Sequence, residues 1–339
     1  MLTDERRPAP AAPPPVEATT RRRRRPWPTI VAFLSPALVL FVLLVLTPIV
    51  VAAYGSFFNW NGFGAPTEFV GLENFRRLLA DEIFAGDLRR ALLLVVLSLG
   101  IQVPVSLALA MLLNQPLRGR RAYRMLFFTP YVLSEVVTAV LFTMIFSPNQ
   151  GLANHVTQLI GLGDLGATWL ADPDTVMYSL FLVISWKYFG FHTILFLAGR
   201  QGIPQELHDA AAIDGAGPWQ AFRRITLPLL GPTIRISVFL SVLGTIQLFD
   251  MVWVLTGGGP IRSSETLAVT MFQEGFKRFH VGYASAISMM IFLISLVFGL
   301  LYQRFVLRRD LEGAITTIGD RRRATPPEHA GPATARCTC

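Results

Sequence analysis

The strongest constraint on this chain is a series of long apolar stretches. Six of them occur, each of about 20 residues or more: 30–54, 90–113, 125–146, 176–197, 233–255 and 283–305. An α-helix rises about 1.5 Å per residue, so roughly 20 residues cross a hydrocarbon layer that is about 30 Å thick. We therefore expect an all-α, polytopic membrane protein with six transmembrane helices.

The composition agrees with this expectation. The chain has 339 residues, of which 52% are hydrophobic and 15% are charged, whereas a soluble domain carries about 25% charged residues. Pro36, Pro48, Pro104 and Pro130 lie inside the stretches and would break soluble helices. In a membrane bundle, neighbouring helices can satisfy the carbonyl groups that these prolines leave free.

The ends of the chain differ from the apolar part. Residues 1–28 are rich in Pro, Ala and Arg and predict a disordered arm, and residues 310–339 predict a loose polar tail. The transmembrane domain is expected at 29–309. Its first stretch is too long for the core of a signal peptide and precedes no small-residue cleavage site, so we expect it to stay uncleaved. Cys337 and Cys339 end the tail; their spacing alone indicates neither a structural disulfide nor a metal site.

The arginines predict the orientation in the membrane. Those at 21–25, 118–124, 200–224 and 304–309 fall on one side if there are six spans, while the loop 147–175 contains no Lys or Arg. Both termini should therefore face the cytoplasm. Four arginines in the first external loop disagree, but that loop is also acidic. The net charge of +8 does not indicate nucleic-acid binding, because the basic residues form no continuous stripe.

The loop 202–232 differs from the other loops in its helix signals. Pro204 can open a helix over 205–213, which Gly215 can end in a left-handed conformation. Pro218 can open a second short helix over 219–225, and we expect Pro228 to end it. Two short helices rich in alanine and glycine could dock into a groove on a partner protein, although a loop lying on the membrane surface is an alternative.

The spacing within this loop resembles the EAA signature of ABC importer permeases. The pattern is Asp209-Ala210-Ala211, then Gly215, and after nine further residues Ile225 and Leu227-Pro228. Asp209 stands where this family usually has Glu, so its side chain is one methylene shorter. The resemblance implies contact with an ATPase subunit through a set of residues in this loop: Glu206, Asp209, Ala210, Ala211, Asp214, Gly215, Phe222, Ile225, Leu227 and Pro228.

The resemblance covers about 29–309 and is greatest to the sugar branch, of the maltose and glycerol-phosphate type. Its motifs include residues 70–75, 249–250, 255–260 and 282–286. It implies the type I ABC importer permease fold in a bacterial cell membrane. It also implies three kinds of partner besides membrane lipid: a second permease subunit, a dimer of ATPase subunits and an external solute-binding protein. Sugar and glycerol phosphate both remain open as solutes.

The chain lacks a phosphate-binding loop of its own. Such a loop needs Lys followed by Ser or Thr, but Lys187 precedes Tyr188 and Lys277 precedes Arg278. We therefore expect no catalytic residue and no metal site here, and ATP with its magnesium should bind to the partner ATPase. The glycines 257–259 indicate an external turn, which we expect to touch the solute-binding protein.

Polar residues inside the apolar stretches are candidates for the solute pathway. They are Glu135, Lys187, His192, Gln247 and Asp250, and the neighbouring Trp186, Tyr188 and Phe191 could offer flat faces to a sugar. The alternative is that the polar groups pair within the bundle and the aromatic groups only pack. A proton-coupled secondary transporter, with Glu135, His192 or Asp250 as relay, is the other function left open; a channel would need a ring of like charges.

Overall fold

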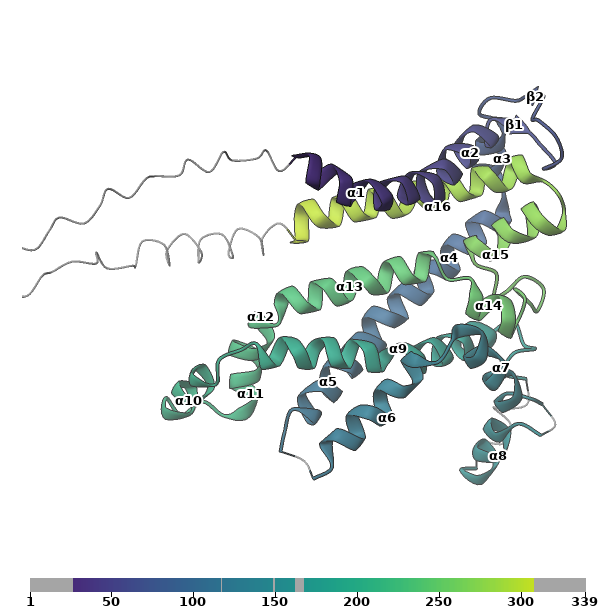
Figure 1. Cartoon of the computed structure of the whole chain (residues 1–339). Helices are drawn as coiled ribbons and strands as arrows, with labels where there is room; N and C mark the ends of the chain where they lie inside the picture. Colours follow the sequence, from purple (N-terminus) through teal and green to yellow (C-terminus); the bar gives the residue numbers. More distant parts are fainter. Residues whose placement is uncertain (1–26, 117, 149, 162–167, 308–339) are drawn as a thin grey trace, which may run out of the picture. The chain divides into compact units, whose positions relative to one another are not determined.

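The computed structural model describes residues 27–116, 118–148, 150–161 and 168–307, which are mostly helical (Figure 1). The expectations for the tail and for nearly all of the arm lie outside these residues, as do those for Cys337 and Cys339. The chain divides into two units, one up to Val50 and one from Val51 onward.

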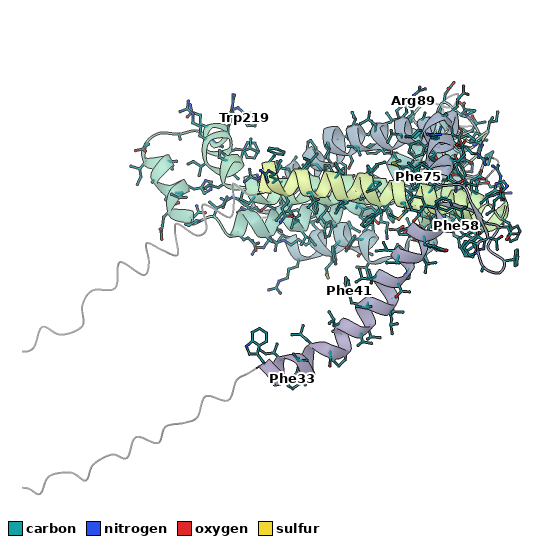
Figure 2. The ribbon with its side chains drawn as sticks, turned by 90° about the horizontal axis from the view of Figure 1, so that it is seen from above. Phe33, Phe41, Phe58, Phe75, Arg89 and Trp219 are labelled. Atoms are coloured by element: carbon teal, nitrogen blue, oxygen red, sulfur yellow. The ribbon has the colours of Figure 1, made fainter. Side chains whose placement is uncertain are left out.

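The first unit is helical and apolar. It contains α1 (Trp27–Phe41), the π-helical segment η1 (Val42–Leu46) and the start of α2 (Thr47–Gly55), which continues past the boundary. Its large apolar side chains are exposed, including the labelled Phe33 and Phe41 (Figure 2). A helix that is apolar on all sides suits contact with lipid or with another membrane helix.

The second unit holds the remaining elements, including a short antiparallel hairpin of β1 (Phe58–Asn59) and β2 (Glu68–Phe69). Helix α9 packs against α5, α6 and α13 near the middle of this unit (Figure 1). The helices, with η marking π-helical segments, are α3 (Glu73–Ala80), α4 (Glu82–Leu97), η2 (Ser98–Gln102), α5 (Val103–Leu113), α6 (Arg120–Val132), α7 (Glu135–Ile145), α8 (Leu152–Leu159), α9 (Val176–Gln201), α10 (Gln205–Ile213), α11 (Pro218–Ala221), η4 (Phe222–Thr226), α12 (Leu227–Leu229), α13 (Gly231–Ile246), α14 (Asp250–Leu255), α15 (Leu267–Phe272), η5 (Gln273–Lys277), α16 (Val281–Tyr302) and η6 (Gln303–Leu307).

Buried apolar side chains form separate cores in this unit. One lies between α4, α7, α9 and α14 and contains Leu180 and Met251. Another joins α3 and α4 to α15 and α16 around Leu267 and Ile287. A third packs α5 against α9. Burial of such side chains stabilises the contacts between helices by close packing.

The expected number of six spans is not confirmed. Within the described residues, four helices are long and apolar enough to cross a membrane: Ile30–Gly55, Glu82–Leu113, Val176–Gln201 and Val281–Val306. They coincide with four of the expected stretches. The other two stretches belong to bent helix pairs, so the total is six only if each pair counts as one span.

The third expected span, 125–146, is broken rather than continuous. Helices α6 and α7 meet at 99°, because Leu133 and Ser134 between them have extended backbone conformations. Pro130 lies in the last turn of α6 and has no N–H to donate, which weakens the helix just before the break.

The prediction of a fifth continuous span over 233–255 is also wrong in its second half. Helix α13 ends at Ile246, and Phe249 leaves the helical region with φ −130° and ψ −66°. The carbonyl of Leu248 accepts a hydrogen bond of 2.7 Å from the Thr266 hydroxyl. A side chain from a distant loop thus satisfies a backbone group that a continuous helix would pair internally.

Pro48 and Pro104, two of the four prolines inside the apolar stretches, and Pro228 in the loop 202–232 are each preceded by a π-helical turn. Segments η1, η2 and η4 end two residues before Pro48, Pro104 and Pro228 respectively. In each, the residue before the proline donates its N–H to the carbonyl five residues earlier. This wider turn relieves the clash between the proline ring and the preceding turn. At these sites the adjustment is local, whereas the sequence suggested that neighbouring helices provide it.

Candidate functional site

The loop 202–232 contains the two helices that the sequence predicts. Helix α10 has the expected bounds of Gln205–Ile213, and Gly215 after it has a positive φ of 78°. The second helix differs from the expectation, because α11, η4 and α12 together continue through Pro228 to Leu229. The wide turn of η4 lets the proline continue the helix instead of ending it.

The tip of this loop exposes small and apolar residues. Ile213 is 86% exposed and Trp219 is 69% exposed, and Trp219 stacks on Phe222 at 5.5 Å. Asp209 is exposed and accepts a hydrogen bond of 3.1 Å from Gln205. Exposed apolar side chains grouped in this way are typical of a surface that a partner covers.

The other expected coupling residues divide between the tip and the base of the loop. Glu206, Ala210, Asp214 and Gly215 are exposed on or just after α10. At the base, the side chains of Thr226 and Leu230 are buried and hold the second helix against the unit. Among the remaining expected coupling residues, Ala211, Phe222, Ile225 and Leu227 are half-buried, whereas Pro228 is exposed. Beside Asp209, burial and the charge of Arg200 lower the pKa of His208.

This loop and the β1–β2 hairpin lie at opposite ends of the second unit. Figure 2 places Trp219 at one end and Phe58, Phe75 and Arg89 at the other. The separation agrees with a loop on one side of the membrane and a hairpin on the other.

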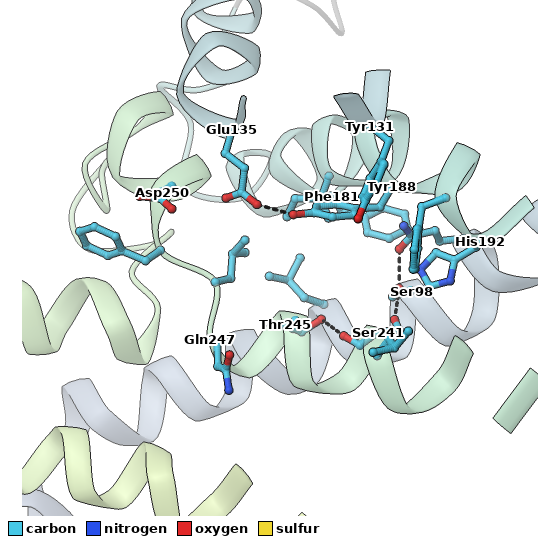
Figure 3. A pocket seen from close by; sticks show the side chains of 18 residues that line it. Ser98, Tyr131, Glu135, Phe181, Tyr188, His192, Ser241, Thr245, Gln247 and Asp250 are labelled. Carbon is cyan, nitrogen blue, oxygen red and sulfur yellow. Dashed lines mark hydrogen bonds between the residues drawn. The ribbon is translucent and has the colours of Figure 1, made fainter. Parts of the chain in front are cut away.

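A cavity of about 390 Å³ lies inside the second unit (Figure 3). This volume is within the range of about 300–1,000 Å³ that small-molecule sites occupy. Its walls come from α4 and η2, the break between α6 and α7, α9, α13 and the segment 247–250. Six of the eight candidate pathway residues line it: Glu135, Tyr188, Phe191, His192, Gln247 and Asp250.

Lys187 does not line the cavity, and neither does Trp186. Its ring packs edge-on against Phe142 at 5.1 Å, next to the buried core around α7. It faces this core because Trp186 and Tyr188 point to different sides of α9, being two residues apart on a helix. The packing alternative therefore describes Trp186 better.

One wall of the cavity carries hydroxyl and amide groups that sequence analysis missed. Ser98 donates to Gln102 at 2.5 Å and lies 2.7 Å from the hydroxyl of Ser241. Thr245 donates to the Ser241 carbonyl at 2.9 Å (Figure 3). The sequence held a signal for this wall, because Ser98 and Gln102 are polar residues inside an apolar stretch, shortly before a proline. They also belong to a π-helical turn, and such turns are common at functional sites.

The broken span is held in place by two consecutive residues of α9. The ammonium group of Lys187, which is 3% exposed, donates to the carbonyl of Leu133 at the end of α6. The hydroxyl of Tyr188 donates to Glu135, the first residue of α7. Each side of the break thus has its own partner on α9.

His192 is likewise paired inside the unit. Its Nδ1 lies 2.7 Å from the Ser237 hydroxyl, and both side chains are buried. Lys187, Glu135 and His192 thus all have partners within the bundle, and Glu135 and His192 also line the cavity.

A buried ionic network lies at the hairpin end of the second unit. Asp87, which is 0% exposed, accepts from Arg90 at 2.6 Å and from the Thr270 hydroxyl at 2.5 Å. Arg90 also donates to the Glu265 carbonyl at 2.8 Å. Burial raises the pKa of Glu265, and the neighbouring Arg262, at 2.9 Å, opposes this rise. The network ties α4 to the loop that follows α14.

This loop contains the glycine turn 257–259. Gly257 and Gly258 have positive φ values of 60° and 91°, which favour glycine. A Cβ on Gly258 would lie 2.6 Å from Cγ of Glu265. The turn is therefore a packed structure attached to the ionic network, with Ile261 beside it 91% exposed.

Comparisons with known proteins agree on one family. Residues 102–310 match the family described as "Binding-protein-dependent transport system inner membrane component". The chain is 37% identical over 276 residues to a probable ABC transporter permease of Pyrococcus horikoshii, covering 81% of this chain and 94% of that protein. It is 32% identical to the diacetylchitobiose uptake system permease protein NgcF of Streptomyces coelicolor, over 98% of this chain and 96% of that protein.

Two further proteins are similar to this chain: a permease for a phosphate ester and a chain of a solved ABC transporter. The sn-glycerol-3-phosphate transport system permease protein UgpA of Yersinia pestis is 34% identical over 81% of this chain and 92% of its own. A chain of a bacterial ABC transporter involved in the import of the acidic polysaccharide alginate superposes with a TM-score of 0.73. It is 25% identical and covers 84% of this chain and 96% of its own.

These matches cover most of the chain, and they leave no need for the secondary-transporter alternative. The chain belongs to the inner membrane components of binding-protein-dependent transport systems, and is a multi-pass permease subunit of an ABC importer.

Proposed function

We propose that this chain forms half of the pathway for a sugar or a related solute, beside a second permease subunit. ATP and magnesium bind to a dimer of ATPase subunits, which contacts the coupling residues of the loop 202–232. The main support for this proposal is the shape of the loop. It has two short helices with exposed Ile213 and Trp219, and it lies at the end of the unit opposite the hairpin.

The orientation follows from the same arrangement. The loop 202–232 carries Arg200, Arg223 and Arg224 at or near its ends, and basic loops stay in the cytoplasm. Both termini then lie in the cytoplasm, as expected for six spans. The hairpin end, with the glycine turn and Ile261, faces the external solute-binding protein.

A sugar suits the cavity by its size and lining. The cavity of about 390 Å³ offers hydroxyl, amide and carboxylate groups together with aromatic rings. These are the groups that hydrogen-bond to sugar hydroxyls and pack on sugar faces. The similar protein NgcF of Streptomyces coelicolor belongs to a diacetylchitobiose uptake system.

Transport would proceed by alternating access. ATP closes the ATPase dimer, and the groove that holds α10 moves. Only Leu230 separates the second helix of the loop from α13, although the two are bent by 64°. Through this short connection the motion passes to α13 and to α9. The cavity between them then opens outward to receive solute, and hydrolysis resets it.

The test uses Gly215, which has open space around it. In proteoliposomes that hold the complete importer, Gly215→Trp should uncouple ATP hydrolysis from uptake by placing a bulky side chain against the partner. Gly215→Ala is the matched control, since it carries the same strain at φ 78° without the bulk. Normal uptake by Gly215→Trp would show that this loop does not couple the two subunits.

A further inference from the structure

The cavity contains two carboxylates that come from equivalent places in the fold. Glu135 is the first residue of α7, directly after the break in the third apolar stretch. Asp250 is the first residue of α14, directly after the break in the fifth. Both line the cavity, so each broken helix delivers one negative charge to it.

No lining residue among those the structure describes is Lys or Arg. Lys187 interacts electrostatically with Glu135, but it does not line the cavity and donates to the carbonyl of Leu133. Even if Lys187 offsets Glu135 completely, Asp250 remains. Its side chain is exposed, and no hydrogen bond or ion pair joins it to another residue in the described parts of the chain.

The remaining lining is hydrogen-bonding and aromatic. Ser98 and Gln102 line the cavity, and Ser241 and Thr245 stand on the wall opposite Glu135 and Tyr188 (Figure 3). Tyr131 stacks on Phe191 at 4.9 Å beside them. Carboxylates only accept hydrogen bonds, so they suit the hydroxyl or amino groups of a solute. A phosphate or carboxylate on the solute would meet like charge there.

We propose that this cavity selects by charge: it accepts an uncharged or amino-bearing carbohydrate and rejects anionic solutes, with Glu135 and Asp250 as the specificity-determining residues. The inference rests on the proposed function, because it concerns the solute of that pathway. It separates this chain from similar proteins that serve the transport of anions, namely sn-glycerol 3-phosphate and alginate.

The first test measures the electrostatic field without needing to know the solute. Cys337 and Cys339 are replaced by Ser, and Gly244→Cys places a thiol on the cavity wall, where a Cβ meets nothing within 4 Å. Its reaction rates with cationic trimethylammonium-ethyl and anionic sulfonatoethyl methanethiosulfonate are compared with those of a small free thiol. Thr245→Cys repeats the measurement at a second lining position.

We expect the cationic reagent to be favoured by about tenfold or more over the free-thiol ratio. Adding Glu135→Gln and Asp250→Asn should return the ratio to within about twofold of the free thiol. A ratio equal to that of the free thiol, or one that the double neutralisation leaves unchanged, would overturn the proposal. This measurement needs no transport, so it stands apart from the Gly215 test.

The second test measures uptake by the intact importer. Labelled diacetylchitobiose and maltose represent uncharged solutes, and sn-glycerol 3-phosphate and alginate oligosaccharides represent anions. ATP-dependent uptake confined to uncharged compounds supports the proposal, and ATP-dependent uptake of either anion refutes it. Failure of the proposed function looks different, since uptake would then persist in the Gly215→Trp importer.

Discussion

The contact between α6 and α9 depends on one glycine, and this dependence can be measured. At Gly190 the two helices approach so closely that an added Cβ would lie 1.9 Å from the carbonyl oxygen of Phe127. The neighbouring rings of Phe127 and Phe189 meet edge-on at 5.7 Å. Gly190→Ala should therefore push α6 away from α9.

The size of the effect follows from the geometry. Real Cβ contacts stay beyond 3.0 Å, and the obstacle is backbone rather than a flexible side chain. The helices must separate by about 1 Å, which for an overpacked core costs roughly 1–3 kcal/mol. The shift would also move Tyr131 and Glu135, which lie at the cavity on and after α6, so uptake should fall together with stability.

Thermal unfolding of the purified protein in detergent, followed by tryptophan fluorescence, measures the change. One kcal/mol corresponds to about 2–4 °C for chains of 150–250 residues, so we expect Tm to fall by at least about 2 °C. Gly299→Ala is the matched control, since a Cβ there meets nothing within 4 Å; Ala should leave Tm unchanged or raise it. Unaltered Tm and uptake in Gly190→Ala would refute the close approach of α6 and α9.

Three further predictions concern other parts of the second unit. Lys187→Met should cost roughly 1–3 kcal/mol, because it leaves the buried carbonyl of Leu133 without its donor; Tm measures this, and Lys277→Met, at an exposed position, should have little effect. Burial raises the pKa of Glu265, so the wild type loses stability as pH rises from the unfolded pKa toward the raised folded pKa. Glu265→Gln lacks this loss, and its Tm relative to wild type should rise with pH across that window; a fall would contradict the shift. Ile261→Cys, exposed beside the glycine turn, should cross-link to a docked solute-binding protein, and absence of any product would argue against contact there.

The sequence predicts the helical membrane character and the first helix of the loop 202–232 well, because both depend on local signals. Apolar length predicts four continuous helices, and Pro204 and Gly215 locate the ends of α10. The effect of Pro228 could not be predicted, since a π-helical turn before a proline allows a helix to continue. The breaks were missed for a related reason: an apolar stretch has the same composition whether it is straight or bent by 99°.

The cavity was only partly predictable, because its lining depends on which side of each helix faces inward. Gln247 and Asp250 were identified as polar residues near the end of a span, and both line the cavity. Trp186 was assigned to the pathway but packs in the core. Ser98 and Ser241 are 143 residues apart in sequence, and their contact depends on helix packing that no local pattern encodes.

The two helix breaks explain why polar residues occur at these depths at all. A break leaves backbone carbonyls unpaired, and in an apolar surrounding each needs a donor. The carbonyl of Leu133 receives Lys187, and that of Leu248 receives Thr266. The residues that follow the breaks, Glu135 and Asp250, then begin short helices whose N-terminal dipoles favour acidic side chains. The same interruptions that make these spans hard to recognise thus place two carboxylates at the cavity. The proposed charge selection therefore depends on both helix breaks.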